Sequence, residues 1–172
     1  MEFTYSIRKA TVKDAEDVIS MIEELAEYEN MLDQCKLTPE IFRKDGFGED
    51  PAFHCIIAEA KTATGVVQTV GYALYYYIYS TFKGRNVYLE DVYVKKPYRK
   101  HGIGGDLMKT VAKIAIEKGC SQYRFACLGW NSDALDFYKS VGARDMTNIE
   151  DWHMLRFEKV ELHDFASKLG KK

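Results

Sequence analysis

The chain has 172 residues, a length typical of one domain, so we expect a single domain over residues 1–172. Lys and Arg total 24 and Asp and Glu total 26, which gives a formal net charge of −2 and excludes the basic excess of a nucleic-acid-binding protein. Hydrophobic residues make up 47% of the chain, but no apolar run reaches the roughly 18 residues of a membrane span. Residues 1–6 have no basic start before an apolar stretch, so we expect a cytoplasmic protein without nucleic acid or membrane as partner.

The four cysteines, at positions 35, 55, 120 and 127, form no CxxC pair and have no His at zinc-finger spacing. We therefore expect reduced thiols and no metal site. Cys55, Cys120 and Cys127 are flanked by apolar residues and are interpreted as small core side chains. Cys127 has the alternative role of a nucleophile, although the sequence assigns it no partner base.

A first helix is predicted over residues 12–29. Thr11 and Asp14 resemble a capping box, and apolar residues then recur at helical spacing. The opposite face is acidic and is interpreted as a solvated surface: it carries Glu16, Asp17, Glu23, Glu24 and Glu27. Thr38 and Pro39 begin a second, short helix, which we expect to end at Gly46.

Strands are predicted where Val, Ile and Tyr predominate, at residues 53–60, 70–79 and 87–94, with one earlier strand before the first helix. A long helix runs from Gly102 to Gly119 and is followed by a strand at 123–128 and a helix at 133–141 capped by Asn131 or Ser132. A last strand is predicted at 153–160, before an amphipathic tail. This order indicates an α+β fold in which helices flank one mixed sheet.

The most informative stretch runs from Val92 to Gly105, where a strand ends, the chain turns through basic residues and glycines, and a helix opens. Backbone N–H groups at a helix N-terminus bind anions, and glycines let a pyrophosphate approach the main chain. The stretch is not a Walker A loop, and the GxGxxG pattern fails at Leu107. What remains is Arg99-x-x-Gly102-x-Gly104, which by itself is also compatible with a simple turn.

In its context this turn resembles the acetyl-CoA signature of the GNAT N-acetyltransferases, whose fold has a central, mostly antiparallel mixed sheet flanked by helices. Further collinear motifs resemble the diamine acetyltransferase family over about residues 7–157: Gly46-Phe47-Gly48, His54-Cys55, Tyr88-Leu89-Glu90-Asp91, Tyr98-Arg99, Trp130-Asn131, Phe137-Tyr138-Lys139 and Gly142-Ala143. The resemblance implies acetyl-CoA as donor, no metal, direct transfer within a ternary complex, and a homodimer.

The resemblance also implies roles for single residues. Tyr138 matches the general acid that protonates the CoA sulfur. The chain has 12 tyrosines, so composition alone favours a packing role for Tyr138. The cofactor contacts that it implies are Val92, Tyr93 and Val94 on the strand, Arg99, Lys100, His101, Gly102, Ile103, Gly104 and Gly105 in the turn, Asn131, Ser132, Asp133 and Ala134 further on, and Tyr138 itself.

Glu90 is the candidate base, because an alkyl ammonium with a pKa near 10.4 must lose a proton before it attacks a thioester. It precedes Asp91 in an apolar strand, and strand alternation predicts that the two side chains lie on opposite faces. By resemblance Glu90 faces the amine through a water. The alternative is that both residues are paired structural acids.

By resemblance the amine pocket is lined by Tyr28, Glu29, Glu90, Arg124, Phe125, Ala126 and Glu150. The sequences of residues 77–85 and 119–122 are more similar to the branch that acetylates thialysine at its side-chain amine than to the spermidine/spermine branch. Gly129 replaces an acid found in many relatives.

The sequence leaves two other functions open, a catalytically inactive CoA-binding protein and a peptide acetyltransferase. The presence of Glu90 and Tyr138 argues against the first, and the acidic pocket argues against the second.

Overall fold

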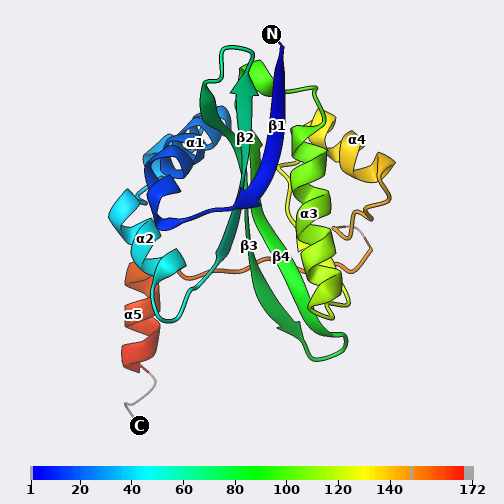
Figure 1. Ribbon diagram of the computed structural model, residues 1–172. Helices are drawn as coiled ribbons and strands as arrows, with labels where there is room; N and C mark the ends of the chain where they lie inside the picture. Colours follow the sequence, from blue (N-terminus) through cyan, green and yellow to red (C-terminus); the bar gives the residue numbers. More distant parts are fainter. Residues whose placement is uncertain (1, 148, 169–172) are drawn as a thin grey trace. The chain divides into compact units, whose positions relative to one another are not determined.

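The computed structural model describes residues 2–147 and 149–168 (Figure 1). The chain forms two compact units, one up to Ala126 and one from Cys127 onward. Within the described residues no helix is long and apolar enough to cross a membrane.

The first unit is built on a five-stranded sheet with the strand order β1-β2-β3-β4-β5. The first four strands form an antiparallel meander, and β5 then joins β4 in parallel. The strands are β1 (Phe3–Lys9), β2 (His54–Thr62), β3 (Val67–Ser80), β4 (Gly84–Val94) and β5 (Tyr123–Phe125). The predicted mixed, mostly antiparallel α+β architecture is therefore confirmed.

Helices cover both faces of this sheet (Figure 1). On one face α1 (Ala15–Tyr28) and α2 (Pro39–Phe47) pack on β2, β3 and β4. The core beneath them contains fully buried side chains such as Met21, Phe42 and Tyr72. On the other face α3 (Ile103–Glu117) connects β4 to β5, and its Leu107 and Val111 are buried. Three short 3₁₀ turns, Val12–Asp14, Leu32–Gln34 and Lys96–Tyr98, complete the unit.

The predicted helix caps of the N-terminal half are confirmed, but the second helix ends one residue later than predicted. The Asp14 carboxylate accepts hydrogen bonds from the Thr11 backbone N–H at 2.7 Å and from its hydroxyl at 2.8 Å, as the capping box predicted. The Thr38 hydroxyl accepts from the backbone N–H of Ile41 at 3.3 Å. Helix α2 continues through Gly46 to Phe47. Gly46 is needed for packing rather than for helix termination, because a Cβ there would lie 2.5 Å from the Phe53 ring.

The second unit contains α4 (Ser132–Ser140), with Asn131 as its predicted cap, and α5 (Lys159–Lys168). The strand predicted at 153–160 is wrong: the chain has no regular structure from His153 to Phe157, and α5 takes up the end of the range. Trp152, Met154 and Leu155 are largely exposed. An apolar segment becomes a strand only where a neighbour supplies backbone hydrogen bonds, and the described chain gives it none.

The four cysteines are free thiols. Cys55 lies in the core, where burial raises its pKa to about 12. Cys120 and Cys127 are only partly buried, so the prediction of a core position is wrong for them. Cys120 follows the end of α3 and Cys127 follows β5, so both lie in connecting segments outside the regular elements.

Candidate active site

The turn between β4 and α3 forms a backbone cradle. Lys100 and Gly102 both have left-handed backbone angles, with φ of 65° and 84°, and α3 begins at the next residue, Ile103. Alternating backbone of this kind points successive N–H groups toward one point, and the first-turn N–H groups of α3 have no helical acceptor. A Cβ added at Gly104 would meet only the Val94 side chain, at 3.7 Å. The open space at Gly104 and these N–H groups are compatible with the predicted phosphate site, which stays a prediction.

Side chains from β1 hold this cradle. The rings of Tyr98 and His101 each lie edge-on to the Phe3 ring, at 5.0 Å between centroids. The Tyr5 hydroxyl donates to Asp106 at 2.7 Å in the first turn of α3. These contacts attach the N-terminal strand to the turn, so the predicted phosphate site depends on residues that the sequence motif does not include.

Arg99, which the resemblance assigns to the cofactor, points back along the sheet. Its Nε donates to the Val94 carbonyl at 2.8 Å, and its guanidinium lies over the rings of Tyr28 and Tyr93, at 5.6 and 5.2 Å from their centroids. The Tyr93 hydroxyl donates to Glu24 at 2.8 Å. The structure thus joins a predicted cofactor residue, Arg99, to a predicted amine-pocket residue, Tyr28.

Strand β4 is paired on one side only in its second half. Its parallel pairing with β5 covers Val87–Leu89 and ends there, whereas β4 itself continues to Val94. The residues from Asp91 to Val94 therefore have a strand partner only on the β3 side among the residues described, and Glu90 has none. Exposed backbone groups along such an edge can bind an extended ligand as an added strand. Val92 and Val94, which the family resemblance assigns to the donor, lie on this half of β4.

The two acids of β4 lie at a β-bulge. Asp91 pairs with Leu74 and Leu89 pairs with Tyr75, so Glu90 is an extra residue without a partner on β3. The Tyr72 hydroxyl donates to Asp91 at 3.1 Å, and the Tyr76 hydroxyl donates to Glu90 at 2.9 Å.

Since Tyr72 and Tyr76 are four residues apart on one strand, they share a face, and both carboxylates reach the face covered by α1. The prediction that Glu90 and Asp91 lie on opposite faces is therefore wrong. The bulge interrupts the alternation on which that prediction rested.

The two acids differ in environment. Glu90 is exposed, whereas Asp91 is mostly buried, and this burial raises the pKa of Asp91 to about 6 despite the opposing effect of the Tyr72 hydrogen bond. The negative charges of Glu90 and Glu29 raise it further. Burial also raises the pKa of Glu29, which caps the C-terminal end of α1. Glu29, Glu90 and Asp91 thus form one acidic cluster.

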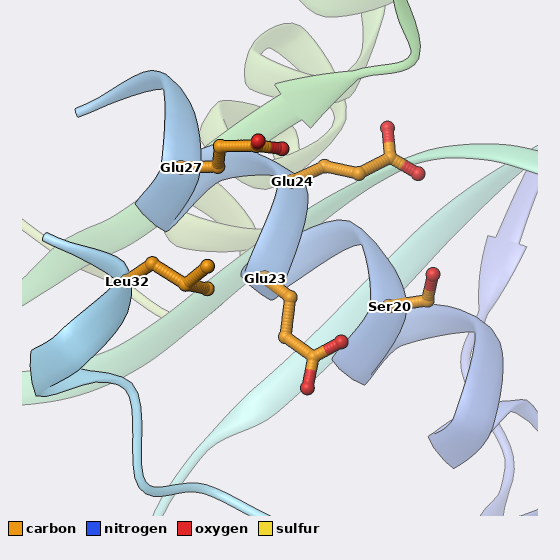
Figure 2. A pocket seen from close by; sticks show the side chains of 5 residues that line it. All are labelled: Ser20, Glu23, Glu24, Glu27 and Leu32. Atoms are coloured by element: carbon orange, nitrogen blue, oxygen red, sulfur yellow. The ribbon is translucent and has the colours of Figure 1, made fainter. Parts of the chain in front are cut away.

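A shallow hollow of about 440 Å³ lies beside α1 and is lined by Ser20, Glu23, Glu24, Glu27 and Leu32 (Figure 2). In this view the Glu23 side chain points away from those of Glu24 and Glu27. Glu24 is already engaged by the Tyr93 hydroxyl and lies 4.0 Å from the Lys95 ammonium. The outer face of α1 is thus acidic, as predicted, and its carboxylates do not converge on one ligand position.

Arg124 on β5 lies in register with a residue beside the acidic cluster of Glu29, Glu90 and Asp91. It pairs with Tyr88, whose ring stacks on Tyr76 at 5.4 Å, and register partners in a sheet share a face. Its Nη2 donates to the Gln122 side chain at 2.7 Å, and the buried Asn86 side chain donates to the same Gln122 oxygen at 3.3 Å. Phe125 ends the strand, and Ala126 follows it at the surface.

The remaining predicted residues belong to the second unit. Asn131 accepts from the backbone N–H of Ala134 at 3.4 Å, and Ser132 and Asp133 form the first turn of α4. Tyr138 is partly buried, and burial raises the pKa of its phenol, with a further rise from nearby Cys127. Glu150 is exposed in a bend.

Sequence reasoning gave Asp91, Tyr72 and Tyr76 no role at this site. The position of Asp91 directly after Glu90 in an apolar strand could have indicated that Asp91 belongs to the site. For Tyr72 and Tyr76 the signal was tyrosines at four-residue spacing in the preceding strand, but the bulge that brings the four side chains together leaves no trace in the sequence.

An anion cradle at one end of β4 and an acidic cluster in its middle suit a transferase that joins an anionic donor to a cationic acceptor. The GNAT acetyltransferase family model matches residues 18–143. The chain is 53% identical over 165 residues to a thialysine N-epsilon-acetyltransferase of Sus scrofa, with 94% of this chain and 97% of that protein covered. A Caenorhabditis elegans protein of the same name is 34% identical over 95% of this chain and 98% of its own length.

A human spermidine/spermine N(1)-acetyltransferase-like protein 1 is 40% identical over 94% of this chain, which corresponds to 24% of that longer protein. Among solved structures, an integron cassette protein of V. cholerae matches with a TM-score of 0.72 over 94% of this chain and 97% of its own, at 24% identity. That similarity shows the fold. The chain therefore belongs to the GNAT acetyltransferase family.

Proposed function

We propose that this acetyltransferase transfers an acetyl group from acetyl-CoA to the side-chain amine of thialysine, S-(2-aminoethyl)-L-cysteine. The single observation that carries the proposal is the 53% identity, over nearly the full length of both chains, to a relative named for that activity. The acidic cluster of Glu29, Glu90 and Asp91 supports it from the side of the acceptor, because carboxylates attract an alkyl ammonium.

The donor would be held by the cradle at Lys100–Gly105 and by the half of β4 that lacks a β5 partner. Family members use acetyl-CoA, whose diphosphate and extended pantetheine match these two features in chemistry. Within the described residues no group of His, Cys, Asp and Glu side chains could hold a metal ion, and the proposal requires none.

In the proposed reaction Glu90 receives a proton from the acceptor ammonium, directly or through a water. The neutral amine then attacks the thioester carbonyl, the C–S bond breaks, and Tyr138 donates its proton to the departing thiolate. The new amide nitrogen loses one N–H proton, which restores the Tyr138 phenol directly or through a water. A phenol with a raised pKa stays protonated at neutral pH, which suits a proton donor. Direct transfer needs no acetylated residue, because holding the two substrates together supplies the required proximity.

Thialysine carries an α-carboxylate that spermidine lacks, and Arg124 lies on the same face of the sheet as the acidic cluster. A cation beside the acids would bind that carboxylate, whereas it would repel the second ammonium of a polyamine. The sulfur of thialysine also lowers the basicity of its amine relative to that of lysine, so less proton removal is required of Glu90.

The test is a thiol-release assay with acetyl-CoA and three acceptors at one pH: thialysine, lysine and spermidine. We expect kcat/KM to be highest for thialysine, with acetylation on the side-chain nitrogen by mass spectrometry. A spermidine value about tenfold or more above that of thialysine, about 1.4 kcal/mol in transition-state binding, would assign the chain to the polyamine branch instead. If none of the three acceptors caused thiol release, the chain would not be an acetyltransferase of these small amines.

The cytoplasmic location and the homodimer expected from the sequence stay predictions. Size-exclusion chromatography with light scattering decides the second, and a monomer at micromolar concentration would contradict it.

A further inference from the structure

The structure holds a second carboxylate at the acidic cluster to which the family resemblance gave no role. Asp91 is mostly buried on the α1 face of the sheet, next to the bulged Glu90, and receives a hydrogen bond from the Tyr72 hydroxyl at 3.1 Å. Tyr72 itself is fully buried, so its hydroxyl is held in place by the core. Such an arrangement fixes one carboxylate oxygen and leaves the other for a further partner.

The groups that face Asp91 from the surrounding elements are tyrosines, carboxylates and a thiol: Tyr72 and Tyr76 on β3, Tyr88 and Glu90 on β4, Cys55 on β2 and Glu29 after α1. A mostly buried carboxylate among acids is costly when ionised, unless a cation joins it. An alkyl ammonium is the cation that the proposed reaction brings to this cluster, and that cation must lose a proton here.

We propose that Asp91, positioned by Tyr72, is a second proton acceptor of the amine site and works beside Glu90. This inference rests on the proposed amine acetylation. In the step, an N–H bond of the acceptor ammonium breaks and an O–H bond forms on the Asp91 carboxylate. The electron pair stays on nitrogen as the lone pair that attacks the thioester. Glu90, which is exposed on the bulge, then passes protons between the cluster and solvent.

The deciding experiment is the pH profile of kcat/KM for thialysine, because this parameter reports the ionisation of the free enzyme. Wild type should lose activity on acidification with an apparent pKa near the value of about 6 that burial gives Asp91. Asp91→Asn should remove that acid limb and lower kcat/KM at pH 7.5 by about tenfold or more, since an amide cannot accept the proton. The KM for acetyl-CoA should stay within about twofold of wild type.

Tyr72→Phe gives a second readout that does not depend on removing the carboxylate. The Tyr72 hydrogen bond lowers the pKa of Asp91, so its loss should move the acid limb to higher pH. Asp17→Asn is the matched control, because Asp17 also accepts from a hydroxyl, that of Thr69 at 2.7 Å, but lies outside the cluster. It should leave the profile unchanged.

The inference is overturned if folded Asp91→Asn keeps the wild-type limb and rate, or if Tyr72→Phe leaves the limb in place. Should Asp91→Asn fail to fold, as judged by circular dichroism, the Tyr72→Phe profile decides alone. An inactive wild type, with no thiol release from any acceptor, would instead remove the proposed function itself, which distinguishes the two failures.

Discussion

At the scale of single residues, Tyr138 and Glu90 carry opposite proton-transfer roles in environments that differ as those roles require. Burial raises the pKa of the Tyr138 phenol, so it remains a donor through the neutral range. Glu90 is exposed on a bulge and accepts only one described side-chain hydrogen bond, from Tyr76. An acid that must exchange protons with water gains from such exposure, whereas a donor to a thiolate gains from exclusion of water.

The first residue-scale prediction is that Tyr138→Phe lowers kcat by about 10²–10⁴-fold, the usual contribution of a general acid. Binding of acetyl-CoA should be retained, because the cradle at Lys100–Gly105 does not involve the phenol. Stopped-flow or steady-state thiol release gives kcat, and calorimetry gives the affinity for CoA. Wild-type turnover in a folded variant would contradict the assignment of Tyr138 as the acid.

The second residue-scale prediction concerns stability. Asp91 has a pKa of about 6 in the folded state against 3.8 ordinarily, so between these values the folded chain binds more protons than the unfolded chain. Its contribution to the free energy of unfolding is therefore present at low pH and lost as the pH rises from about 4 to about 6. Asp91→Asn should be more stable than wild type at pH 7 to 8, by up to about 3 kcal/mol, with the difference shrinking toward pH 4.

Asp14 provides a control of opposite sign. Its hydrogen bonds and ion pair with Arg8 lower its pKa to about 2, so its stabilising contribution is present at neutral pH and lost as the pH falls toward 2. Asp14→Asn should be less stable than wild type at pH 7. Urea unfolding of both variants from pH 2 to 8 measures the two trends, and equal pH dependence for Asp91→Asn and wild type would contradict the raised pKa.

At the scale of elements, periodicity and capping residues predicted the helices and strands of the first unit, but they did not predict the irregular pairing of β3 with β4. The capping residues Thr11, Thr38 and Asn131 were read correctly because each cap is a local hydrogen bond within three residues. The bulge at Glu90 was missed because it depends on the register of β3 against β4, which is a non-local property. The strand predicted at 153–160 failed for a related reason, since periodicity does not reveal whether a pairing partner exists.

The phosphate cradle shows how much of the site the sequence could supply. The glycines predicted a turn before a helix, and the structure has left-handed backbone at Gly102 followed by α3, while phosphate binding stays a prediction. The path of Arg99 was not predictable, because its side chain is fixed by the rings of Tyr28 and Tyr93, which are distant in sequence. A motif thus predicts the backbone of a turn better than the direction of its long side chains.

The element-scale prediction is that Gly104→Val raises the KM for acetyl-CoA by about tenfold or more and leaves the fold intact. A Cβ at Gly104 meets only Val94 at 3.7 Å within the protein, so the added methyl groups would occupy space for the ligand rather than for the core. Gly104→Ala, with a smaller side chain, should have a weaker effect. Thermal unfolding of both variants provides the folding control, and an unchanged KM for the valine variant would refute this placement of the diphosphate.

At the scale of the whole molecule, the formal charge of −2 conceals an uneven distribution of charge. Lys95, Lys96, Lys100 and the α3 N-terminus gather at the donor end of β4, while Glu29, Glu90 and Asp91 gather in the acceptor region. In the proposed function, the sheet would separate the binding of the anionic donor from the binding of the cationic acceptor along one strand. The anionic diphosphate of the donor and the acids of the acceptor region then stay apart, and only the thioester and the amine have to come together.

The last prediction tests Arg124, which pairs in register with Tyr88 beside the acidic cluster. Arg124→Met should lower kcat/KM for thialysine by about 10–100-fold, the usual range for a lost charge-assisted contact of about 1.5–3 kcal/mol. Spermidine, which has no carboxylate, should lose nothing or gain, because the substitution removes a repulsive charge. The preference of thialysine over spermidine should therefore fall, and both values are measured at the same pH in the same thiol-release assay.

Arg85→Met is the matched control, because Arg85 also lies on the sheet and stacks on an aromatic ring, that of Tyr77 at 5.8 Å, but belongs to the β3–β4 hairpin end away from the acids. It should leave the preference unchanged. Gln122→Ala should reproduce part of the Arg124→Met effect, since the Gln122 oxygen accepts from both Nε and Nη2 of Arg124, at 3.2 and 2.7 Å, and so fixes the guanidinium. A parallel loss of activity with thialysine and spermidine in Arg124→Met would show that Arg124 supports the strand rather than selects the acceptor.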